Sequence, residues 1–95
     1  MERINIGLCE GRHNIPHVTD YIFPSVVNPT DIVGLKETIE KKFETMKYAN
    51  VNLYVTGLTV ALVEVIKYCL KNDIKLTLYH YNKEDNNYYP QTVND

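Results

Sequence analysis

Four residues that could bind an anion lie where a predicted strand turns into a predicted helix. They are Thr56, Gly57, Leu58 and Thr59, between the β-forming run 51–55 and an apolar stretch at helical spacing. Backbone N–H groups at a helix N-terminus can bind a phosphate, together with nearby hydroxyl groups. The alternative is a plain connection in which Thr59 is the N-cap. The spacing matches neither GxGxxG nor a Walker loop, so no standard dinucleotide or nucleoside-triphosphate motif is predicted.

A second group of candidates follows the first predicted strand. Glu10, Gly11, Arg12 and His13 come directly after the run that ends at Cys9. An arginine can bind a phosphate through two hydrogen bonds, and a histidine can donate a hydrogen bond or a proton. The alternative is that Arg12 pairs with Glu10 or with solvent and that His13 is an ordinary loop residue. Cys9 lacks the arginine spacing of a phosphatase loop, so it is predicted to pack rather than to act as a nucleophile.

His80 and Tyr81 complete the predicted ligand site, because they lie at the end of another β-forming run. His80 either contacts the ligand or makes a structural hydrogen bond to a neighbouring loop. Strand tyrosines either pack in the core and at edges or form a stacking surface for a nucleobase. The strand tyrosines are Tyr54, Tyr79, Tyr81, Tyr88 and Tyr89. A zinc site at His13, His17 and His80 is disfavoured, since no carboxylate or cysteine completes the set, and no metal or other cofactor is predicted.

The elements that position these residues are organised around 51–81, which is predicted to form a strand, a glycine turn, a helix and a strand. The strands are 51–55 and 74–81, and the helix is 58–70. Such a unit crosses over in the right-handed sense and makes its two strands parallel. If the strand at 3–9 is parallel to both, the three candidate segments converge on one edge of the sheet. That edge is the usual ligand site of open parallel sheets.

Local signals predict the remaining elements of the first half. Residues 3–9 alternate as a half-buried strand, and 14–28 is predicted to be a long ordered loop. Asn28, which a proline follows, predicts the N-cap of an amphipathic helix that runs to about Tyr48. The helix at 58–70 is apolar around most of its circumference. It is therefore predicted to lie in the domain centre or to form a subunit interface.

The C-terminal part is predicted to be a hairpin. Residues 82–87 form a polar turn, and 88–93 form a short strand that pairs antiparallel with the strand before it. Pro90 places this strand at an edge of the sheet. Residues 1–95 are therefore predicted to be a single Rossmann-like three-layer α/β domain, with a mainly parallel sheet and a C-terminal β-hairpin.

Size, charge and cysteine content limit the function classes. A chain of 95 residues buries only a small core, so a homodimer or higher oligomer is expected. The net charge of -2 and the pI near 5.9 favour a small anionic ligand over a nucleic-acid polymer. Cys9 and Cys69 are too few for a disulfide scaffold, so we expect reduced thiols and a cytoplasmic protein. No apolar run has the length of a membrane span, so no membrane partner is expected.

Short motifs carry a resemblance to a known group of proteins. One strand is followed by an arginine and a histidine, another leads through a glycine turn into an apolar helix, and a third ends in His-Tyr. The residues concerned are Arg12, His13, Gly57, Leu58, Thr59, His80 and Tyr81. The pattern resembles the small proteins of type III CRISPR systems, which include compact ring nucleases and CARF sensor domains. The resemblance covers mainly 3–13 and 51–81, and Val60 stands where the turn in those proteins often has a proline nearby.

The resemblance implies a dimer that binds a cyclic nucleotide second messenger of antiviral defence between its subunits. One outcome is sequestration without turnover, as in viral anti-defence sponges. The alternative is a metal-independent ring nuclease, in which Arg12 and His13 donate hydrogen bonds to the developing charge. No general base other than His13 or His80 is evident, which favours binding over catalysis. A third hypothesis is a protein interaction module without a ligand, whose interface is the apolar second helix and the aromatic loop.

Overall fold

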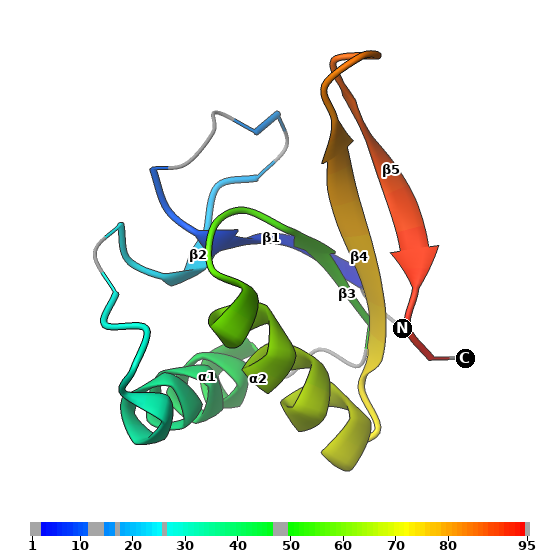
Figure 1. The fold of residues 1–95 in the computed structure, drawn as a ribbon. Helices are drawn as coiled ribbons and strands as arrows, with labels where there is room; N and C mark the ends of the chain where they lie inside the picture. The colour runs from blue at the N-terminus through cyan, green and yellow to red at the C-terminus, as the bar shows by residue number, and fades with distance from the viewer. Residues whose placement is uncertain (1–2, 12–14, 17, 26, 47–49, 95) are drawn as a thin grey trace.

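The computed structural model describes residues 3–11, 15–16, 18–25, 27–46 and 50–94, which form one five-stranded sheet and two helices (Figure 1). The elements are β1 (Arg3–Cys9), β2 (Tyr21–Phe23), α1 (Ile32–Met46), β3 (Asn50–Tyr54), α2 (Thr59–Lys71), β4 (Lys75–Asn82) and β5 (Asn87–Thr92). The strand order is β2-β1-β3-β4-β5, and only β5 is antiparallel to its neighbour.

The prediction that three strands run parallel is confirmed. Ile6 of β1 lies opposite Leu53 of β3, and Leu53 lies opposite Leu78 of β4, in parallel register. Because side chains alternate along a strand, these residues share the face that the helices cover. The buried core of this face and the helices includes Ile6, Leu8, Leu35, Ile39, Phe43, Val51, Leu53, Val65, Leu76 and Leu78. The carboxyl ends of β1, β3 and β4 therefore point to one edge of the sheet, which we call the carboxyl edge.

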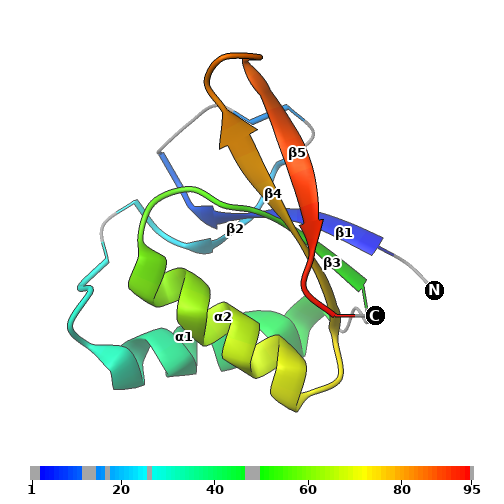
Figure 2. The ribbon, with the colours of Figure 1, turned by 45° about the vertical axis from the view of Figure 1, so that its right-hand side comes forward.

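Both helices lie on the same face of the sheet, as Figures 1 and 2 show. α1 connects β2 to β3 and α2 connects β3 to β4, so both crossovers advance across the sheet in one direction. Right-handed crossovers that advance in one direction place their helices on one face. The connection in the opposite direction, from β1 to β2, has no helix among its described residues. The predicted three-layer arrangement is thus not confirmed, and we call the sheet face without helices the open face.

β2 corrects the prediction that 14–28 is a loop throughout. Gly7 pairs with Tyr21, and Cys9 pairs with Phe23, in parallel register. A strand of three residues is too short to give a periodic signal in the sequence. Phe23 is buried in the core, whereas the Tyr21 ring lies over Gly7 so closely that a Cβ there would be 2.3 Å from two ring carbons. Gly7 is therefore required for the approach of the Tyr21 ring.

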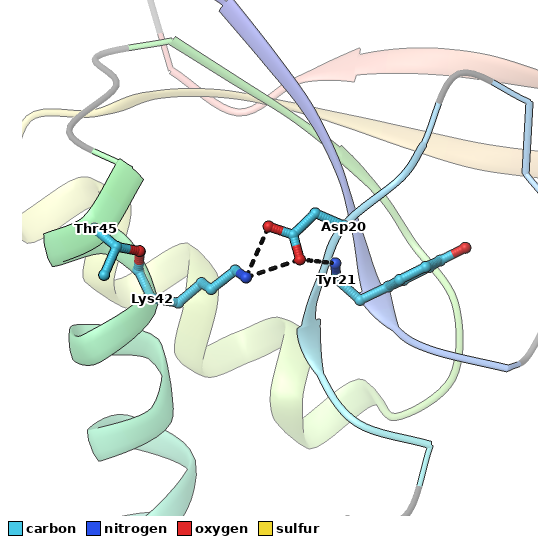
Figure 3. Close-up of polar contacts among 4 residues, drawn as sticks. All are labelled: Asp20, Tyr21, Lys42 and Thr45. Atoms are coloured by element: carbon cyan, nitrogen blue, oxygen red, sulfur yellow. Dashed lines mark hydrogen bonds and ion pairs between the residues drawn. The ribbon is translucent and has the colours of Figure 1, made fainter.

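An ion pair joins β2 to α1 (Figure 3). Lys42 Nζ lies 2.8 Å and 2.7 Å from Asp20 Oδ1 and Oδ2, and Oδ1 also accepts a hydrogen bond from the Tyr21 N–H. The hydrogen bond from Lys42 is the main cause that lowers the pKa of Asp20. Because Asp20 is exposed, the pair contributes at most about 1 kcal/mol of stability. The main consequence of the pair is the orientation of the chain at the start of β2. Asp20 faces α1, and the Tyr21 ring points away from α1.

α1 begins later than predicted, because Asp31 rather than Asn28 is its N-cap. Asp31 Oδ1 accepts a hydrogen bond from the Gly34 N–H at 3.0 Å, and the Asp31 carbonyl accepts one from the Leu35 N–H at 3.0 Å. Asn28 instead closes the preceding turn, where its Oδ1 accepts a hydrogen bond from the Thr30 N–H. Both residue types are good caps, so the sequence alone did not distinguish them.

α2 is covered on one side only. Val65 and Cys69 are fully buried, but Val63 is 46% and Leu70 is 53% exposed. Glu64 is only 7% exposed, although its side chain is charged. The helix therefore does not lie in the domain centre, and the subunit-interface alternative remains.

The C-terminal hairpin is confirmed. β4 and β5 pair antiparallel, with Tyr81 opposite Tyr88, and β5 is the edge strand of the sheet. Pro90 lies in this edge strand, where its missing N–H is tolerated. Figure 1 shows that the hairpin extends beyond the carboxyl ends of the other strands.

Candidate functional site

Thr56 joins the carboxyl ends of β1 and β3. Its Oγ1 accepts a hydrogen bond from the Cys9 N–H at 3.1 Å and donates one to the Cys9 carbonyl at 2.8 Å. The residue is only 2% exposed, so its hydroxyl serves the backbone instead of the predicted ligand. As a result, the turns that start at Glu10 and Gly57 begin side by side.

The connections after β1 and β3 leave the sheet in opposite directions. The chain after β1 goes to β2 on one side, and the chain after β3 goes through α2 to β4 on the other. Open α/β sheets usually bind ligands where the connections diverge in this way. Gly11 and Gly57 have φ values of 82° and 91°, which favour glycine, so both chains turn directly after their strands.

The turn after β3 leaves the start of α2 without a side-chain cap. Leu58, not Thr59, is the N-cap residue, and its carbonyl accepts a hydrogen bond from the Leu62 N–H at 3.1 Å. The predicted capping role of Thr59 is therefore wrong. Gly57 and Thr59 are exposed, while Leu58 packs partly against the core. Backbone N–H groups of the first turn of α2 thus have no side-chain acceptor among the described residues.

The turn after β1 is described in part. Glu10 and Gly11 are exposed, and the Glu10 N–H donates a hydrogen bond to the Phe23 carbonyl at 3.0 Å. Arg12 and His13 lie outside the described residues. In the sequence, these two predicted residues come directly after the described segment, which lies at the carboxyl edge.

His80 and Tyr81 lie on opposite faces of the hairpin. The His80 ring is 5.4 Å from the Tyr89 ring, and its Nε2 is 2.7 Å from Gln91 Oε1, so it makes a structural hydrogen bond to the neighbouring strand. The Tyr81 ring is 5.4 Å from the Tyr88 ring on the open face. The structure thus separates the two predicted site residues.

Five tyrosines gather on the open face. Tyr54 and Tyr79 are stacked, with ring centroids 4.8 Å apart and an interplanar angle of 15°, and Tyr88 meets Tyr54 edge-on at 5.1 Å. We call Tyr21, Tyr54, Tyr79, Tyr81 and Tyr88 the tyrosine cluster. Four members were predicted, whereas Tyr21 was missed because β2 was missed. The remaining predicted tyrosine, at position 89, lies on the other face.

Burial shapes the chemistry of the cluster. It raises the pKa of Tyr54 and of Tyr88, and neighbouring phenols raise both further. The Tyr88 hydroxyl is buried and has no hydrogen-bond partner among the described residues. The phenols of Tyr54 and Tyr88 therefore stay neutral at physiological pH.

Other chemistry is limited in the part of the chain that the structure describes. Cys9 and Cys69 are fully buried free cysteines, and burial raises the pKa of the Cys69 thiol to about 12. The prediction that Cys9 packs in the core is confirmed. Over the same residues, no group of three or more His, Cys, Asp and Glu side chains could hold a metal ion. His17, like His13, lies outside them. Neither described helix is long and apolar enough to cross a membrane.

Comparison with known proteins gives no matching protein family, curated protein or solved structure. The fold and the site define the protein as a small α/β domain with a mostly parallel sheet. Its carboxyl edge is flanked by two glycine turns, and its open face carries the tyrosine cluster.

Proposed function

We propose that the protein binds an anionic nucleotide-type ligand at the carboxyl edge. The divergence of the connections after β1 and β3 carries this proposal, since such points are the usual ligand sites of open α/β sheets. Gly57 has no side chain to block a phosphate, and the uncapped N–H groups of α2 follow it directly. Thr56 holds the two turns together. In this proposal the domain is Rossmann-like in binding its ligand at the carboxyl ends of parallel strands, and it has a single layer of helices.

The proposed ligand is a cyclic nucleotide second messenger of antiviral defence, as the sequence resemblance implies. Arg12 is the candidate for the phosphate, and the tyrosine cluster, beside the edge, is the candidate for a base. Retention is favoured over cleavage because His80 already bonds to Gln91, which leaves His13 as the candidate general base of the ring-nuclease alternative. A cytoplasmic location belongs to the same proposal.

A retention assay tests the proposal directly. The purified protein is incubated with cyclic di- and trinucleotides, cyclic tetra-adenylate and cyclic ADP-ribose isomers, freed of unbound ligand and then heated. Chromatography of the released material is expected to show one intact ligand. Linear products would support the nuclease alternative instead, and no retained ligand from the whole panel would overturn the proposal.

Arg12→Ala is expected to weaken retention about 10- to 150-fold, which corresponds to the roughly 1.5–3 kcal/mol of a hydrogen bond to a charged group. The control is Lys41→Ala, which removes a cationic side chain from α1, away from the carboxyl edge. Equilibrium dialysis with the retained nucleotide gives both affinities. An unchanged affinity for Arg12→Ala would remove this residue from the site.

The exposed apolar side of α2 favours a second candidate function, a protein interface, here between two copies of the chain. Val63 and Leu70 are both about half exposed on this helix. Leu70→Asp is therefore expected to convert a dimer into a monomer, as measured by light scattering. Val33→Asp on α1, at a position that is 67% exposed, is the matched control and should leave the mass unchanged. A wild-type protein that is monomeric at high concentration would exclude this interface.

A further inference from the structure

The strands place no acidic side chain on the open face. Alternate residues of β1, β3, β4 and β5 point to this face, from Arg3 and Asn5 in β1 to Tyr88 and Thr92 in β5. Cys9 and Phe23, at the ends of β1 and β2, are instead buried in the core. Arg3 and Lys75 are its charged strand residues, and both are cationic. The acidic residues among the described ones lie on the helices, in the turns and loops, or next to strand ends. The strand positions of the open face therefore carry two cations and no carboxylate, in a chain whose net charge is -2.

The amino half of the open face is a polar hollow. It has a volume of about 240 Å³, and its lining includes Arg3, Asn50, Asn52, Lys75, Thr77 and Thr92. Asn52 is held in place by a hydrogen bond from its Nδ2 to Asn5 Oδ1 at 2.9 Å. Amide, hydroxyl and cationic groups of this kind can donate hydrogen bonds to phosphate and sugar oxygens.

The carboxyl half of the open face is the tyrosine cluster. Tyr79 lies four residues after Lys75 along β4, which is about 13 Å at the rise of a strand. Tyr54 and Tyr79 stack on each other and hold each other in place, while Tyr81 keeps 38% of its surface exposed. Cationic and aromatic contacts thus follow one another along the same strands.

We infer that the open face binds single-stranded nucleic acid, with phosphates near Arg3 and Lys75 and bases against the tyrosine cluster. Proteins that bind single strands without sequence preference combine cationic groups along the backbone with aromatic side chains on which bases stack. The net charge of the chain argues against such a ligand, but the local charge of this face does not. A second copy of the same face is a poorer occupant, because its strands offer no carboxylate to the two cations. This ligand and the polar hollow lie beyond the proposed function, and the tyrosine cluster is shared with it.

Fluorescence anisotropy with a labelled ten-residue oligothymidylate tests the inference on the full chain. If two phosphates are neutralised, log K should fall with log salt at a slope of about -1.4, that is 2 × -0.7. Lys75→Gln should weaken binding and reduce the slope to about -0.7. Tyr81→Leu should weaken binding at least about fivefold through lost stacking.

Two matched controls separate the open face from the rest of the surface. Lys41→Gln removes the same charge from α1, and Tyr89→Leu removes the same ring from the opposite face of the hairpin. Both should leave the affinity and the salt slope unchanged, and thermal melting checks that all four variants fold. The inference is overturned if no saturable binding occurs, if the controls weaken binding as much as Lys75→Gln and Tyr81→Leu, or if Lys75→Gln changes the mass by light scattering instead of the affinity.

Discussion

Thr56→Val is expected to lower the free energy of unfolding by about 2–4 kcal/mol, a large effect for an isosteric substitution. The valine keeps the volume of the side chain but removes the hydroxyl that serves both the N–H and the carbonyl of Cys9. Each buried polar group left without a partner costs about 1–3 kcal/mol. Urea titration followed by circular dichroism measures the change. Because Thr56 also holds the two turns of the carboxyl edge together, the same variant should retain less nucleotide.

Two further variants identify the hydroxyl as the cause. Thr56→Ser keeps the hydroxyl and loses one methyl group, so it should cost only about 1 kcal/mol. Thr77→Val makes the same change on the open face, where the side chain is half-buried, and should have little effect. If Thr56→Ser is as destabilising as Thr56→Val, the two hydrogen bonds to Cys9 do not explain the effect.

The parallel core could be predicted because its signals are local. The stretch 51–81 contains β-formers, a glycine turn and an apolar helix in direct succession, and handedness then fixes the direction of the second strand. β2 could not be predicted in this way, because it has only three residues and its place depends on pairing with β1, where Gly7 lies opposite Tyr21. Without β2, the direction of the first connection, and hence the number of layers, could not be deduced.

The sequence predicted where the candidate site lies, but it did not predict the contacts that its side chains make. Gly11 and Gly57 each follow a predicted strand, where the chain must turn. Both have positive φ values, which agree with turns at these positions. The role of Thr56 depends on a partner 47 residues away, which no local pattern indicates. The opposite faces of His80 and Tyr81 follow from simple alternation along β4, so the sequence itself contains the signal that separates them.

Net charge was a poor guide to the open face. The value of -2 is a sum over the whole chain, whose described acidic residues lie away from the strand positions on that face. Strand alternation assigns Arg3 and Lys75 to the same face only once the register of β1, β3 and β4 is known. The charge of one face can therefore be assigned only when the fold is known, whereas the total charge follows from the sequence alone.

Stability is expected to fall as the pH rises from about 9 to 12, because burial raises the pKa of Cys69 from 9.0 to about 12. Below pH 9 the thiol is protonated in the folded and in the unfolded state, so its contribution to the free energy of unfolding is fully present. Between the two pKa values the unfolded chain loses a proton that the folded chain keeps, which favours unfolding by up to about 1.4 kcal/mol per pH unit. Burial also raises the pKa of Tyr54, Tyr68 and Tyr88, so above about pH 10 these phenols act in the same direction.

Urea titrations at pH 8, 9, 10 and 11 measure this dependence. Cys69→Ala removes the thiol, so the variant should start less stable, because a buried side chain becomes smaller, but lose less stability per pH unit above pH 9. Val65→Ala, which also makes a fully buried side chain of α2 smaller but removes no titrating group, is the control and should keep the wild-type slope. Parallel curves for Cys69→Ala and the wild type would show that the thiol does not keep its proton in the folded state, and the alkaline loss would then be due to the tyrosines.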